Sequence, residues 1–159
     1  MCEVCPSWLS FILYNPVRKA LTDRQRILDE SCVSPDSVVL EVGAGNGFFT
    51  EAIAERARKV YAVELQHGMV KKLKKRTGRF GEKVHIVHND IAMHDIHEGE
   101  ADVCLMYYSF HEVINRKDAT LQIARALKPG GVLAIYEPTI EVNKTAMLTT
   151  INMFESAGL

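Results

Sequence analysis

Five short apolar runs alternate with mostly helical segments from Ser37 onward. The runs predict strands at positions 38–42, 60–64, 84–88, 103–107 and 132–136. The periodic segments predict helices at positions 48–58, 68–76, 116–127 and 143–156. The runs are continuously apolar, which is typical of strands covered on both faces. Strands that alternate with helices in this way predict an α/β fold with a doubly wound, mainly parallel sheet and helices on both of its faces.

The length of 159 residues is enough for one domain with one core. Ahead of the predicted sheet, apolar residues at helical spacing predict two short helices, with Thr22 or Asp23 as a cap of the second. We expect positions 1–36 to form a helical cap over the ligand-binding edge of the sheet and positions 37–159 to form the core of the same domain.

The net charge of −1 gives no general attraction to nucleic acid or to an anionic membrane. No apolar run approaches the ~20 residues that cross a bilayer, and the N-terminal apolar stretch lacks the flanks of a signal peptide. The four cysteines need not form disulfides in such a protein. We expect a cytoplasmic protein without a membrane partner.

The first predicted strand runs into a turn, Glu41 to Gly47, that has glycine at positions 43, 45 and 47. In doubly wound sheets, ligands bind beyond the carboxyl ends of the strands, near the reversal of strand order. Glycine weakens both strands and helices, so its use at alternate positions predicts a tight turn where a ligand approaches bare backbone. Free N–H groups at the start of the next helix favour a negative or hydrogen-bonding ligand group. The alternative is an ordinary strand-to-helix turn without a ligand.

The spacing of these glycines argues against a dinucleotide. The dinucleotide pattern G-x-G-x-x-G needs its third glycine at position 48 or 50, where the chain has Phe48 and Thr50. The observed pattern, Glu-x-Gly-x-Gly-x-Gly, therefore disfavours a nicotinamide-dependent dehydrogenase.

Acidic residues follow the second and third predicted strands. A carboxylate at Glu64 can accept both ribose hydroxyls of an adenosine, although an acid there could instead only stabilise the dipole of the next helix. Asp90 can accept the exocyclic amine of adenine while Ile91 covers a face of the ring; alternatively, Asn89-Asp90 forms an ordinary turn. Combined with the glycine turn, the acids favour an adenosine-containing ligand.

Aromatic and ionisable side chains crowd the end of the fourth predicted strand. The faces of Tyr107 and Tyr108 could receive a cation, or these rings could be packing residues with polar tips. His111 could act as a base, because the ordinary pKa of histidine lies near neutrality, or could be a hydrogen-bonded structural residue. Glu137, after the fifth predicted strand, is a second candidate for the base.

Five segments, in order along the chain, resemble the motifs of class I S-adenosylmethionine-dependent methyltransferases: 39–47, 60–64, 89–91, 108–113 and 127–133. The fourth is similar to the small-molecule branch of the family. The fifth, with Lys128-Pro129-Gly130-Gly131, is similar to the family's turn into the fifth strand. The resemblance covers about 37–159 and implies a Rossmann-like methyltransferase fold with S-adenosylmethionine as the cofactor.

The resemblance also implies a role for each segment. The glycine turn shapes the site of the methionine part, Glu64 holds the ribose and Asp90 holds the adenine. The expected cofactor contacts are Glu41, Gly43, Ala44, Gly45, Asn46, Gly47, Glu64, Leu65, Asp90, Ile91 and Tyr107. The expected catalytic residues are His111 and Tyr108, and no metal is expected.

We therefore expect an enzyme that aligns a small-molecule acceptor for in-line attack on the methyl group of the sulfonium. A second function class is a non-catalytic subunit that binds the cofactor or a partner without turnover. A second acceptor class, a thiol or a metalloid, follows from Cys2-x-x-Cys5, which with Cys32 could present three thiolates to a soft group. Alternatively, these cysteines are idle residues of a frayed terminus.

Two further features concern partners. Relatives in the family usually continue into two more strands, so the fold could lack this C-terminal pair; strand 132–136 would then be an exposed edge that a second copy could cover. The basic run at 71–76 could contact phosphate on RNA, but charges that spread around a helix favour a solvated outer face. We expect a homo-oligomer as the means of covering the edge, and no nucleic-acid partner.

Overall fold

Five strands form one sheet in the residues that this computed structural model describes, 22–93 and 98–159. The strands are β1 (Val38–Val42), β2 (Lys59–Val63), β3 (Val84–Val87), β4 (Ala101–Tyr107) and β5 (Leu127–Tyr136). Their order is β3-β2-β1-β4-β5, and every neighbouring pair is parallel. The strand order reverses beside β1, because β2 and β3 lie on one side of it and β4 and β5 on the other. The predicted doubly wound α/β fold is confirmed.

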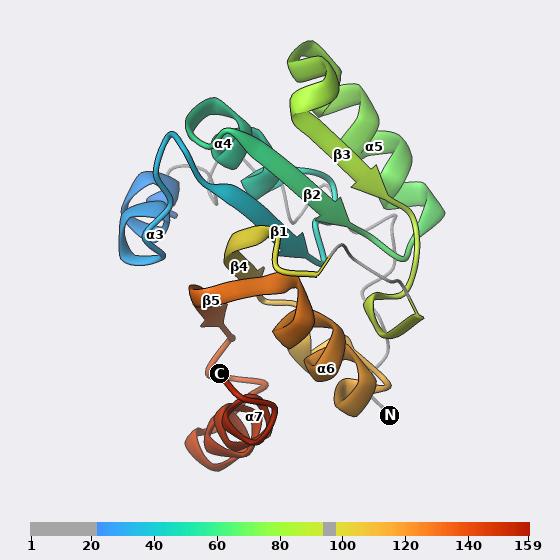
Figure 1. Ribbon diagram of the computed structural model, residues 1–159. Helices are drawn as coiled ribbons and strands as arrows, with labels where there is room; N and C mark the ends of the chain where they lie inside the picture. The colour runs from blue at the N-terminus through green and yellow to red at the C-terminus, as the bar shows by residue number, and fades with distance from the viewer. Residues whose placement is uncertain (1–21, 94–97) are drawn as a thin grey trace.

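Helices cover both faces of the sheet (Figure 1). One face carries α3 (Arg24–Glu30), α4 (Phe48–Arg56) and α5 (His67–Thr77), and the other carries α6 (Arg116–Ala126) and α7 (Lys144–Ser156). The short 3-10 helices are η2 (Gly78–Lys83), η3 (Ile91–Met93) and η4 (Phe110–Glu112). Within β1, Val39 packs among residues of α3, α4 and α5, whereas Leu40 packs among residues of α6 and α7. The apolar strand therefore reflects burial on both faces, as predicted.

The fifth strand begins earlier than the sequence predicts. The segment Lys128-Pro129-Gly130-Gly131 was expected to be a turn, but it lies inside β5. Ala101 pairs with Leu127 and Val103 pairs with Val132, so the intervening residues of β5 bulge out of the ladder. The Pro and Gly residues of this segment are typical of a turn, but the pairing of β5 with β4 places the segment within the strand.

The described part of the N-terminal segment packs beside α4. Asp23 caps α3, because its carboxylate accepts the backbone N–H of Arg26 at 3.0 Å, and Leu28 is fully buried against the sheet. The rest of the predicted cap, including Cys2 and Cys5, lies outside the described residues. Its placement over the ligand-binding edge remains a prediction.

The edge formed by β5 has no further strand beside it among the described residues, and α7 is the last element. Covering of this edge by a second copy remains a prediction. None of the helices within residues 22–93 and 98–159 combines the length and the apolar character needed to span a bilayer.

Candidate functional site

A pocket of about 490 Å³ lies beyond the carboxyl ends of the strands, where the strand order reverses. It collects residues from the loops after β1, β2, β3, β4 and β5. The predicted site residues that line it are Glu41, Gly43, Ala44, Gly45, Asn46, Glu64, Leu65, Asp90, Ile91, Tyr107, Tyr108 and His111. Of the predicted set, Gly47 alone is not among the lining residues. Segments far apart in the sequence are thus brought to one cavity, and their individual roles remain predictions.

Two glycines of the turn are required by close approach. Gly43 has φ +77°, and a Cβ there would lie 2.4 Å from Cβ of Ser109. Ser109, which the sequence did not single out, is buried and donates its hydroxyl to the carbonyl of Val42 at 2.7 Å. Gly47 has φ +86°, and a Cβ there would lie 2.9 Å from Cδ1 of Leu73 on α5. Gly43 therefore lets the loop after β4 meet the pocket, whereas Gly47 lets α5 press on the turn from outside.

The backbone N–H groups of the turn are largely used within the protein. Those of Gly43 and Ala44 both donate to the carbonyl of Val63 at 3.0 Å, and that of Gly45 donates to the carboxylate of Glu64 at 2.8 Å. A cradle for pyrophosphate needs such groups to point at the ligand. The N–H groups of these three residues therefore do not point at the pocket, which adds to the case against a dinucleotide, whereas the free N–H groups expected at the start of α4 remain a prediction.

Glu41 is a buried acid on the pocket wall, 5% exposed. Its carboxyl accepts the hydroxyl of Thr50 on α4 at 2.5 Å. Burial, opposed by the hydrogen bond from Thr50 and assisted by the nearby charge of Glu64, raises the pKa of Glu41 to about 8. Near neutral pH, Glu41 is therefore mostly a neutral hydrogen-bonding group. The sequence did not indicate this role of Thr50, which entered the sequence analysis only because the dinucleotide pattern needs a glycine at position 50.

Glu64 is 7% exposed and is held at the pocket by two backbone N–H groups. Gly45 donates to Oε2 at 2.8 Å and Gln66 donates to Oε1 at 2.7 Å. Burial raises the pKa of Glu64, and these backbone hydrogen bonds oppose the rise. A carboxylate oxygen accepts more than one hydrogen bond, so both oxygens keep capacity for hydroxyl donors of a ligand.

The predicted adenine end of the pocket is formed by the loop after β3. Asp90 is partly buried and accepts the backbone N–H of Ala92 at 2.9 Å, and Ile91 is 4% exposed. Leu65 lies on the same side of the pocket and is half exposed. An acid next to two apolar side chains suits a flat ring that carries an amine.

Tyr107 and Tyr108 form a stacked pair at the end of β4. Their ring centroids are 4.2 Å apart, and Tyr107 also packs on Phe49 at 4.4 Å. Tyr108 has φ +57°, a left-handed conformation that costs a bulky residue about 1–2 kcal/mol, and its N–H donates to the carbonyl of Tyr136 at 2.8 Å. Such strain is typical of functional sites, because the surrounding structure must hold it.

His111 is held by two carboxylates from the loop after β5. Its backbone N–H donates to Oε1 of Glu137 at 3.0 Å, and its Nδ1 lies 2.5 Å from Oε2 of the same residue. The Nε2 atom lies 2.9 Å from Oε2 of Glu141, a residue that the sequence did not indicate. The side chain of Glu137 is 4% exposed, whereas that of Glu141 is 55% exposed. Glu137 therefore lies behind His111 and fixes its ring, and the more exposed Glu141 faces the other nitrogen.

No cysteine of the described residues lines this pocket. Cys32 is exposed, and within residues 22–93 and 98–159 no three His, Cys, Asp or Glu side chains gather as a metal site. The three-thiolate hypothesis also involves Cys2 and Cys5, which lie outside the described part of the chain.

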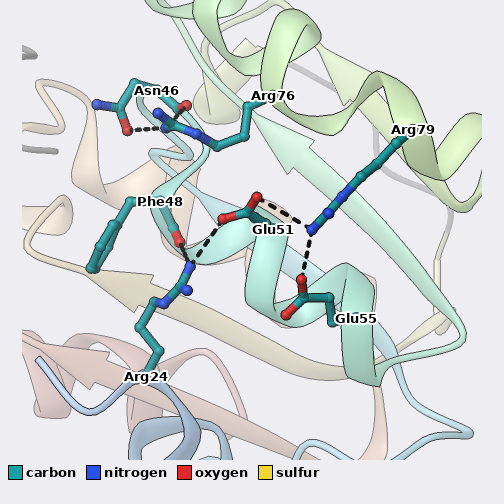
Figure 2. A network of polar contacts seen from close by, with 7 residues as sticks. All are labelled: Arg24, Asn46, Phe48, Glu51, Glu55, Arg76 and Arg79. Carbon is teal, nitrogen blue, oxygen red and sulfur yellow. Dashed lines mark hydrogen bonds and ion pairs between the residues drawn. The ribbon is translucent and has the colours of Figure 1, made fainter. Parts of the chain in front are cut away.

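The basic run on α5 divides into two kinds of side chain. Lys71, Lys72, Lys74 and Lys75 are exposed, as predicted for an outer face. Arg76 departs from that prediction, because it turns inward and donates to the side-chain oxygen of Asn46 at 3.0 Å (Figure 2). The last residue of the run therefore touches the glycine turn.

Comparison with known proteins agrees with the architecture. The family model described as a methyltransferase domain matches residues 40–135. An uncharacterised methyltransferase of Geobacillus sp. is 29% identical over 71% of this chain and 53% of its own length, and the ribosomal RNA small subunit methyltransferase A of Alkaliphilus metalliredigens is 34% identical over 48% and 26%. The crystal structure of a SAM-dependent methyltransferase from Aquifex aeolicus superposes with a TM-score of 0.82 at 24% identity, covering 98% of this chain and 89% of that one.

The chain thus spans about a quarter to a half of the length of these two curated relatives. The matched family region nonetheless contains the glycine turn, the acids after β2 and β3 and the loop after β4. The chain belongs to the methyltransferase-domain family, with the class I S-adenosylmethionine-dependent fold that its motifs predicted.

Proposed function

We propose that this chain binds S-adenosylmethionine in the pocket and transfers its methyl group to a small-molecule acceptor. One observation carries the proposal: the His111–Glu137 pair lines, or directly backs, the same cavity as the glycine turn and Glu64. A proton-accepting group and a cofactor cradle are thereby combined in one site.

The pocket fits this cofactor by the chemistry of its donors and acceptors. Glu64 would accept the ribose hydroxyls, and Asp90 with Ile91 would receive the adenine. Glu41 and the bare backbone of Gly43 would adjoin the methionine part. A pocket with several carboxyl groups suits a ligand with hydroxyls, an amine and a positive sulfonium, and it suits a pyrophosphate poorly.

The chemistry of transfer divides between alignment and proton removal. S-adenosylmethionine supplies an activated methyl group, and the walls of the pocket would hold the acceptor in line with it. The stacked faces of Tyr107 and Tyr108 would favour positive charge nearby. Glu137, bound to Nδ1 of His111, would leave Nε2 as the atom that removes a proton from the methyl-accepting molecule. The exposed Glu141 side chain, which contacts Nε2, would first have to move away.

Replacing His111 with alanine is expected to lower methyl transfer by about 100-fold, the usual contribution of a general base, while cofactor binding stays near wild type. The measurement is transfer of a labelled methyl group to a panel of phenols, amines, thiols and arsenite. His85, an exposed histidine on β3, provides the matched control as His85→Ala. Equal rates in His111→Ala and wild type would contradict the proposed base.

A ribosomal RNA acceptor is the second candidate. The A. metalliredigens relative carries that activity in its name, and α5 exposes four lysines within positions 71–76. An arm of the transfer assay with a ribosomal RNA fragment separates the two acceptors, because phosphate contacts make RNA binding fall steeply with salt. Cofactor binding without transfer to any acceptor would instead support a non-catalytic subunit.

A further inference from the structure

Two arginines from different helices hold the outside of the glycine turn (Figure 2). Arg76, at the C-terminal end of α5, donates through Nη1 to both the backbone carbonyl and the side-chain oxygen of Asn46. Arg24, at the start of α3, donates through Nη1 to the carbonyl of Phe48 at 2.7 Å. The turn is thus tied at Asn46, and the first residue of α4, which directly follows the turn, is tied at Phe48.

The contact with α5 is close as well as polar. A Cβ on Gly47 would lie 3.5 Å from Cδ of Arg76 and 2.9 Å from Cδ1 of Leu73. Asn46 is 5% exposed, so the guanidinium of Arg76 meets its partner away from bulk water. Hydrogen bonds to a charged donor are stronger than neutral ones, and water competes less with them in such a place.

The position of Arg24 needs an explanation, because a cation near the N-terminus of a helix is unfavourable. The guanidinium of Arg24 reaches from α3 to the start of α4, where it is 5.0 Å from the ring centre of Phe48. Glu51, in the first turn of α4, offsets the charge: its Oε2 lies 3.4 Å from Arg24 and its Oε1 lies 3.3 Å from Arg79. Arg79 in turn pairs with Glu55 at 2.6 Å. The network neutralises Arg24 and leaves its bond to the turn in place.

A turn with glycine at alternate positions gains from such ties. Fixing the backbone of each residue costs about 1–2 kcal/mol of conformational entropy, and glycine loses the most freedom. If the protein orders the turn before the ligand arrives, the ligand does not bear that cost.

We propose that Arg76 and Arg24 are positioning residues that hold the glycine turn in the shape that receives the methionine part of the cofactor, an inference that rests on the proposed cofactor site. Neither arginine lines the pocket. They act through Asn46 and Phe48, both of which do.

The sign of the effect separates positioning from simple electrostatics. S-adenosylmethionine carries a net positive charge, so removal of a nearby cation would by Coulomb's law alone strengthen its binding. Loss of a positioning contact would weaken binding of both S-adenosylmethionine and S-adenosylhomocysteine, which lacks the sulfonium charge and has no net charge.

The test is calorimetric titration of the purified chain with S-adenosylmethionine, S-adenosylhomocysteine and 5′-methylthioadenosine, which lacks the amino-acid part. Arg76→Met should weaken binding of the first two about tenfold and leave the third within twofold. Arg76→Lys, which keeps one donor to Asn46, should recover part of the loss. Lys75→Met is the matched control, because Lys75 is the neighbouring cation on α5 and is exposed; it should bind all three ligands as wild type does.

Amide exchange of residues 45–47 in the unliganded protein gives a local readout. It should accelerate most in Arg76→Met, less in Arg76→Lys, and not in Lys75→Met. Unchanged affinities in Arg76→Met, tighter binding of S-adenosylmethionine alone, or equal weakening of all three ligands would each overturn the positioning role. Absence of binding to the wild-type chain would overturn the proposed cofactor site itself, and this role with it.

Discussion

Replacing Gly43 with alanine is expected to lower the free energy of unfolding by about 2–5 kcal/mol. A residue other than glycine at φ +77° costs about 1–2 kcal/mol. The added Cβ would also lie 2.4 Å from Cβ of Ser109, a distance that forces the backbone of the turn or of the loop after β4 to shift. Overpacking of this kind typically costs a further 1–3 kcal/mol. Urea unfolding at fixed pH measures the total.

Gly130 provides a matched control, because it has φ +78° and a Cβ there would meet nothing within 4 Å. Gly130→Ala should therefore cost only the conformational part, about 1–2 kcal/mol. Combining Gly43→Ala with Ser109→Gly should restore part of the stability, since the clashing Cβ is removed. Equal losses in Gly43→Ala and Gly130→Ala would show that the loop after β4 does not press on the turn.

Glu41→Gln is expected to remove most of a decline in stability between pH 5 and pH 8. The native pKa of Glu41, about 8, lies above the ordinary 4.5, so the native state holds a proton that the unfolded chain releases. This stabilisation is complete below pH 4.5 and is lost as the pH rises through 8. The slope approaches 1.36 kcal/mol per pH unit within that window, for a total on the order of 3–5 kcal/mol.

Urea unfolding of both proteins at pH 5, 6, 7 and 8 measures the effect. Glutamine keeps the shape and can still accept the hydroxyl of Thr50, so the two proteins should differ little at pH 5. At pH 8 the variant should be the more stable by several kcal/mol. Glu64, whose pKa burial also raises, adds to the slope in both proteins and largely cancels in the difference. Parallel curves across the range would contradict burial of an acid at this position.

The sheet and the pocket were predictable because their signals are local. Continuous apolar runs mark strands buried on both faces, and residues just after parallel strands meet at one edge whatever their distance in the sequence. Glu41, Glu64, Asp90 and His111 could therefore be placed in one site before any coordinates.

The sequence failed where a contact depends on how separate elements pack. Helical periodicity gave Arg76 an outward position, but its long side chain reaches back to Asn46. Glu141 and Thr50 became visible only when their loop and helix were placed beside His111 and Glu41. The start of β5 depends on pairing with Ala101 of β4, which no local pattern reports.

The most direct test of the cofactor site is calorimetric titration of wild type and Glu64→Ala with S-adenosylmethionine, S-adenosylhomocysteine and NAD, with the exposed Glu82→Ala as control. The structure predicts micromolar binding of the two sulfur compounds, no binding of NAD, and a loss of about 100-fold in Glu64→Ala, which corresponds to about 2.7 kcal/mol for two charged hydrogen bonds to the ribose. Glu82→Ala should bind as wild type does. Failure of the folded wild-type chain to bind either sulfur compound, or full binding in Glu64→Ala, would contradict a cofactor site at this pocket.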